Sequence, residues 1–96
     1  MQEWKTPQVE RLISAMLQLK DAEEFSAFLR DVCTHSELTE MARRFAAAEL
    51  LHRGTPVRRV AEQTGLSTTT VSRVSHWKKH GEGGYDLVIS RLSPDA

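Results

Sequence analysis

Short hydroxyl side chains and cationic side chains follow one another between residues 67 and 80 of this 96-residue chain. A threonine can hydrogen-bond to a base edge or place its methyl group against that of thymine, and an arginine can bind guanine through two hydrogen bonds. A helix N-terminus also offers free N–H groups to a phosphate. Strings of threonine are poor helix formers, so helix propensity alone does not explain the run. The alternative is a solvated helix face that begins with Ser67 as its cap.

These residue types predict contact with double-stranded DNA. One arginine from the segment before residue 67 is added to the candidate residues. The hydroxyl-rich start of the helix is expected to face a DNA groove, whereas its basic end is expected to lie nearer the phosphate backbone. The candidate DNA-binding residues are Arg58, Ser67, Thr68, Thr69, Thr70, Ser72, Arg73, His76, Lys78 and Lys79.

Four small or apolar residues in the same region have the spacing of a helix-turn-helix. Two helices joined by a tight turn cross at a steep angle, so the first needs a small residue at the crossing, which Ala61 supplies. Gly65 can adopt the positive φ of the turn without steric cost. Val71 and Val74 can bury one side of the second helix and leave its other side free. An ordinary corner between two helices explains the packing but not the residue types on the free side.

The charge of the chain is unevenly distributed, although its formal sum is zero. Residues 1–51 hold six Lys/Arg against nine Asp/Glu, whereas residues 52–80 hold six against a single acid, Glu62. A cationic segment inside a neutral chain is the electrostatic footprint of a protein that binds a polyanion. A solvated basic helix face has the same composition.

Other reactive residues do not assemble a catalytic or metal-binding site. His76 and His80 stand four residues apart, a spacing that can hold zinc, but the sequence gives no further ligand to complete the set. Cys33 is the only cysteine, which excludes an internal disulfide, and no activating base accompanies it. We therefore expect no enzyme activity, no metal and no cofactor.

Six helices and no strand are expected to position these residues, so the predicted fold class is all-α. Apolar residues recur at helical spacing, and proline, glycine and capping residues separate the segments. The expected helices begin at Pro7 and after Asp21, then run from Thr34 or Ser36 to about His52, over 56–64, from Ser67 to about Lys79, and from Tyr85 to Leu92.

The same pattern predicts which apolar side chains are buried and which need a partner. The first helix carries a wide apolar arc that so short a chain cannot cover alone, and this predicts a homodimer. That arc consists of Val9, Leu12, Ile13, Met16, Leu17 and Leu19. The residues expected to face the core are Leu38, Met41, Phe45, Ala48, Leu50 and Leu51 in the third helix, Val71 and Val74 in the fifth with Trp77 as a candidate third, and Leu87, Val88 and Leu92 in the last.

Length and hydropathy indicate one small helical domain over residues 1–96, with the helix-turn-helix at about 56–79. No stretch approaches the roughly 20 apolar residues of a membrane span, and the N-terminus lacks the basic and apolar regions of a secretion signal. A cytoplasmic protein without a membrane partner is therefore expected.

From about Leu17 to Leu92 the chain resembles the Trp repressor superfamily, and more closely its Trp repressor-like (YerC/YecD-type) branch. The resemblance rests on the segments 32–38, 43–44, 48–54 and 65–73, which read VCTHSEL, RR, AELLHRG and GLSTTTVSR. It implies six helices, a homodimer with interlocked N-terminal helices, and a helix-turn-helix that binds operator DNA. In that docking geometry, two recognition helices lie roughly 34 Å apart on a pseudo-palindromic site, and the Trp repressor is itself the established example.

The resemblance also places a candidate ligand site. Arg44 and Arg73 match the two arginines that enclose tryptophan in the repressor, with Arg43 as an alternative to Arg44, and Thr34 matches a threonine beside the ligand. Val74 and Trp77 stand where the repressor has glycine and serine, and this added bulk is expected to fill the space of a free indole. If the Trp77 ring is buried, its replacement by serine should cost roughly 3 kcal/mol of stability.

The sequence therefore predicts a sequence-specific DNA-binding regulator, a repressor by resemblance, that acts as a homodimer without tryptophan as corepressor. A tryptophan-dependent repressor is one alternative. A protein–protein interaction module with the same fold, on which the basic face is incidental, is the other.

Overall fold

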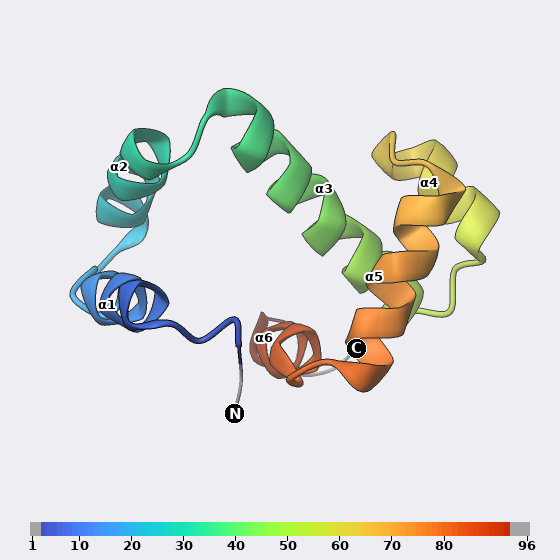
Figure 1. Ribbon diagram of the computed structural model, residues 1–96. Coiled ribbons are helices and arrows are strands. Elements are labelled where there is room, and N and C mark those ends of the chain that lie inside the picture. The colour runs from blue at the N-terminus through green and yellow to red at the C-terminus, as the bar shows by residue number, and fades with distance from the viewer. Residues whose placement is uncertain (1–2, 93–96) are drawn as a thin grey trace. The chain divides into compact units, whose positions relative to one another are not determined.

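Six helices make up the part of the chain that the computed structural model describes, residues 3–92, and these residues contain no strand (Figure 1). The all-α prediction is confirmed, and the helices begin within about two residues of the predicted positions, as do the ends of the last four, for which an end was predicted. The helices are α1 (Pro7–Met16), α2 (Ala22–Val32), α3 (His35–His52), α4 (Val57–Thr64), α5 (Thr68–His80) and α6 (Gly84–Leu92). None of the helices in residues 3–92 is long and apolar enough to cross a membrane.

Side-chain caps fix where the helices start. Thr6 accepts a hydrogen bond from the Val9 N–H at the start of α1, and Asp21 accepts one from the Glu24 N–H at the start of α2. At α3 the Thr34 hydroxyl accepts from the Glu37 N–H at 3.1 Å, and the Glu37 carboxylate accepts from the Thr34 N–H at 2.8 Å. This reciprocal pair makes Thr34, rather than Ser36, the cap, and each such cap contributes about 1 kcal/mol.

The chain divides into two compact units after Leu38. The first unit contains α1, α2 and the first turn of α3. Neither α1 nor α2 has a buried residue. Both helices nevertheless carry large apolar side chains that are exposed within the chain, namely Leu12, Ile13, Leu17, Phe25 and Val32.

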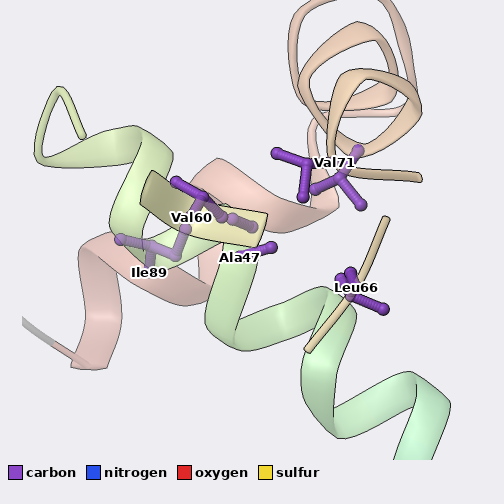
Figure 2. Packing of buried hydrophobic residues seen from close by; sticks show 7 residues of the cluster. Ala47, Val60, Leu66, Val71 and Ile89 are labelled. Atoms are coloured by element: carbon purple, nitrogen blue, oxygen red, sulfur yellow. The ribbon is translucent and has the colours of Figure 1, made fainter. Parts of the chain in front are cut away.

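The second unit contains the hydrophobic core. α4 packs on α5, and α5 packs on α6. Figure 2 shows Ala47 of α3, Val60 of α4 and Ile89 of α6 close together, with Val71 of α5 and Leu66 of the preceding turn completing the cluster. Val60 and Val71 are fully buried, which stabilises the fold by roughly 1.5–3 kcal/mol for each side chain.

Two details of the core differ from the sequence prediction. Met41 is 47% exposed although it lies on the same side of α3 as the buried Ala48, because it lies too far along the helix to reach the core. Met41 lies six residues before Ala47, which is about 9 Å along the helix axis, at 1.5 Å per residue. In α6 only Ile89 is buried, while Leu87, Val88 and Leu92 are exposed. A short helix at the edge of the core turns only one narrow face inward.

Gly81 is expected to tolerate no side chain, because it closes α5 at φ −85° and ψ −147° and an added Cβ would collide with the Trp77 carbonyl oxygen. We predict that Gly81→Ala lowers the free energy of unfolding by about 1–3 kcal/mol. The matched control is Gly84→Ala at the first position of α6, where a Cβ meets open space. Urea unfolding followed by circular dichroism measures both, and equal stabilities would contradict the prediction.

Candidate nucleic-acid interface

The turn between α4 and α5 has the geometry that the sequence predicts. Gly65 ends α4 in the left-handed conformation at φ +78°, and its N–H donates to the Ala61 carbonyl at 3.0 Å. A residue with a Cβ is strained at this φ, which explains the glycine. α5 then begins after Ser67, whose hydroxyl accepts from the Thr70 N–H at 3.0 Å. The two helices are therefore joined by a turn of three residues.

Burial on one side of α5 determines which side is free. Val71 and Val74 are buried against the core, as the sequence predicted, and Leu66 is buried just before the helix (Figure 2). Since these side chains fix the rotation of α5 about its axis, the residues between them must face away from the core.

Most of the predicted DNA-binding residues lie on this free side. Thr70 and Lys78 are half-buried, and the other eight are exposed. No intramolecular hydrogen bond engages the hydroxyl groups of Thr68 and Thr69 within residues 3–92, whereas those of Ser67 and Thr70 lie 3.0 Å apart and bond to each other. The free hydroxyls are therefore at the first turn of α5. The exposed residues are Arg58, Ser67, Thr68, Thr69, Ser72, Arg73, His76 and Lys79.

Lys78 differs from the other cations of α5 because it has a partner. Its ammonium nitrogen lies 2.8 Å from a carboxylate oxygen of Asp86 on α6. The hydrogen bond from Lys78 lowers the pKa of the Asp86 carboxyl, and the charges of Lys78 and His52 act in the same direction. Sequence reasoning missed Asp86, because nothing local in the sequence indicates that α6 folds back onto α5.

Arg43 is a second cation that sequence reasoning did not place at this surface. A Cβ at Gly65 would lie 3.7 Å from the central carbon of the Arg43 guanidinium, so this side chain of α3 reaches the α4–α5 turn. Arg43 is exposed and forms no ion pair with any described residue of 3–92. It therefore adds a free positive charge beside the start of α5.

A cavity of about 390 Å³ borders α3, α5 and α6 in the second unit. The predicted ligand residues Arg44 and Arg73 both line it, and the guanidinium of Arg44 lies 3.6 Å from the carboxylate of Glu40. Arg44 rather than Arg43 is thus the cavity arginine. Thr34 belongs to the first unit, where its hydroxyl caps α3. The lining residues are Glu40, Arg44, Thr70, Arg73, Val74, Trp77 and Tyr85.

Trp77, the candidate third core residue of α5, is not buried within the chain, and the expectation that its bulk fills the space of a free indole is not met. Its side chain is 58% exposed and forms part of the cavity wall, with the His76 ring edge-on at 5.0 Å between ring centroids. Val74 is buried in the core and also borders the cavity. The physical reason is the rotation of α5. Val71 and Val74 face the core, and Trp77, at the next position of the i, i+3 series, has moved about 60° around the helix, as the 3.6-residue repeat dictates.

The histidines of α5 do not form a metal site by themselves. The rings of His76 and His80 lie 4.9 Å apart. Within the described residues, no group of three or more His, Cys, Asp and Glu side chains is placed to hold a metal ion.

A buried valine pair, a glycine turn and a free side rich in hydroxyls and cations define the class of protein, a helix-turn-helix DNA-binding domain. The Trp repressor protein family model matches residues 7–93. The chain belongs to the Trp repressor family, in its YerC-like branch, which confirms the resemblance. This is a family of DNA-binding regulators and not of enzymes.

Individual relatives support the assignment. The chain is 33% identical to the YerC protein of Bacillus subtilis (strain 168) over 85 residues, which cover 88% of this chain and 82% of that protein. A TrpR-like protein from Eubacterium eligens is 43% identical, with a TM-score of 0.86 over 92% of this chain and 91% of that one. A second solved structure, from Staphylococcus aureus, is 28% identical, with a TM-score of 0.87 over 96% and 94% of the two chains.

The exposure of Trp77 changes the expected effect of its replacement. We predict that Trp77→Ser lowers the free energy of unfolding by about 1–2 kcal/mol, less than the roughly 3 kcal/mol of a fully buried ring, because Trp77 is 58% exposed. Val71→Ala is the control, and its expected cost is about 2 kcal/mol, since Val71 is fully buried. Urea unfolding followed by far-ultraviolet circular dichroism compares them. A loss near 3 kcal/mol for Trp77→Ser would show that the ring is covered in the assembled protein.

Proposed function

We propose that this protein is a sequence-specific transcriptional regulator that binds double-stranded operator DNA as a homodimer and needs no tryptophan as corepressor. The observation that carries the proposal is the free side of α5, where exposed hydroxyls at the first turn precede exposed cations. α5 is the recognition helix, Thr68, Thr69 and Arg73 read base edges, and Arg58, His76 and Lys79 contact the backbone. Arg43 joins this set as a phosphate contact beside the turn.

Salt-dependent binding tests the function. We predict that the affinity for a duplex of random sequence falls steeply with salt, because each neutralised phosphate releases counterions. Lys79→Ala should weaken binding to all sequences about equally and lower the slope of log K against log[salt] by about 1. Thr69→Ala should instead change which sequence is selected from a random DNA pool and leave the slope unchanged.

The outcomes separate DNA binding from the alternative. A flat salt dependence of the wild-type protein would favour a protein–protein interaction module. A sequence preference that responds to Lys79→Ala and not to Thr69→Ala would reverse the proposed orientation of α5 on DNA.

A homodimer is supported by the apolar faces of the first unit. α1, the Leu17 that follows it, and α2 carry exposed Leu12, Ile13, Leu17, Phe25 and Val32, and neither helix has a fully buried residue. Large contiguous apolar surfaces of this kind mark an interface. A second copy supplies both the cover for these faces and a second recognition helix for a two-fold symmetric site.

Light scattering tests the dimer. We predict a dimer at micromolar concentration for the wild-type chain and a monomer for Ile13→Glu, because a charge at the centre of the apolar face must be desolvated on association. Gln8→Glu, on the same helix but at an exposed polar position, is the control and should remain dimeric. A wild-type monomer at this concentration would contradict the proposal.

A tryptophan-dependent repressor is the second candidate function, because Arg44 and Arg73 share one cavity. One feature supports independence from tryptophan. Glu40 already pairs with Arg44 at 3.6 Å and so competes with the carboxylate of a ligand for that guanidinium.

We predict that millimolar L-tryptophan leaves the affinity for selected DNA unchanged and gives no binding heat in a calorimetric titration. A ligand shifts a conformational equilibrium only when it binds one state more tightly than the other. A micromolar tryptophan site that disappears in Arg44→Ala, together with tighter DNA binding in the presence of tryptophan, would establish the second candidate instead.

A further inference from the structure

The C-terminal end of α5 is tied to α6 by a single ion pair. The Lys78 ammonium lies 2.8 Å from the Asp86 carboxylate, and the Lys78 side chain is only 17% exposed. Its neighbour Lys79 is exposed and has no ion-pair partner among the described residues. Two adjacent lysines of one helix are therefore in different environments, and one role cannot be assumed for both.

The environment of Lys78 does not suit a phosphate contact. A phosphate contact contributes to affinity by replacing condensed counterions with a free cation. The charge of Lys78 is already balanced by a carboxylate, and the aliphatic part of its side chain lies against the protein. The lowered pKa of Asp86 agrees with this pairing, because the hydrogen bond from Lys78 is its largest cause.

Besides this ion pair, α6 has apolar contacts with the core, since Tyr85 packs against it and its ring lies 6.4 Å from that of Phe45. A short segment joins α5 to α6 (Figure 1). It contains Gly81 and Gly83, and Gly84 follows at the start of α6. Gly81 is held by the hydrogen bond from its N–H to the Trp77 carbonyl, whereas Gly83 and Gly84 leave the rest of the connection many backbone conformations. Ile89 is the only buried side chain of α6. The ion pair adds to these apolar contacts at the last turn of α5, with the Asp86 side chain 53% exposed.

We propose that Lys78 is a positioning residue for DNA recognition, whose ion pair with Asp86 holds the C-terminal half of the recognition helix on α6. The inference rests on the proposed DNA-binding function. The ion pair sets the direction in which Arg73, His76 and Lys79 extend toward DNA, and Lys78 itself makes no phosphate contact.

The experiment compares binding to the selected duplex and to random duplex over a range of salt concentrations. Lys78→Ala and Asp86→Ala should each reduce the preference for the selected duplex by about tenfold, the size typical of coupled neighbouring residues. Lys78→Ala should leave the salt slope unchanged, whereas the matched control Lys79→Ala should lower it by about 1. The charge-exchanged variant Lys78→Glu/Asp86→Lys should recover most of the preference.

A phosphate contact gives the opposite pattern. Lys78→Ala would then lower the salt slope by about 1, and Asp86→Ala would tighten binding to both duplexes, because it frees the ammonium. Either result would overturn the inference. Circular dichroism monitors folding, and Lys78→Arg, which keeps the ion pair, should retain the preference where Lys78→Ala loses it.

The salt dependence of the wild-type protein distinguishes a wrong role for Lys78 from a wrong function for the whole protein. A wild-type protein with a flat salt dependence would overturn the proposed function and the inference with it. A steep wild-type slope that Lys78→Ala reduces would overturn the inference alone.

Discussion

The burial of Val71 and Val74 is the constraint on which the free side of α5 depends, because it fixes how this helix is rotated about its axis. Both valines lie on one side of α5, and Ala47 and Ala48 of α3 belong to the same buried cluster. Ala47 and Ala48 are fully buried, so α3 contributes only small side chains to this cluster. A helix fixed by two buried residues three positions apart can neither roll nor slide without exposing one of them. The free side of α5 is thus determined by its buried side.

Local features were predictable from the sequence. Ala61, Gly65 and the two valines act through the geometry of adjacent helices, so their spacing was sufficient to place the turn and to say which side of α5 is buried. The starts of the helices followed from capping residues, although Thr34 and Ser36 could be separated only by the hydrogen bonds of Thr34 with Glu37.

Features that depend on contacts between distant segments were not predictable. Asp86 reaches Lys78, and Arg43 reaches Gly65, only because α6 and α3 pack beside the helix-turn-helix. The exposure of Trp77 has the same origin. Trp77 follows the buried Val74 by three residues, and this spacing predicts that a large aromatic side chain is buried as well. The core, however, is built from small side chains, and α5 continues past its edge. Whether Trp77 is buried depends on the size of the residues that other helices contribute to the core, and the sequence of α5 alone does not give that size.

The cavity and the ion pair at the end of α5 both affect the tilt of the C-terminal half of α5 relative to α3. Arg73, Val74 and Trp77 line the cavity, and Lys78 follows directly on the helix. A molecule in the cavity and a tie to α6 both restrict how the C-terminal half of α5 tilts relative to α3. Restriction by a side chain of the same chain costs none of the translational and rotational freedom that a free ligand loses on binding. An internal ion pair at the end of α5 restricts this tilt without an effector, and this is a structural basis for the proposed independence from a corepressor.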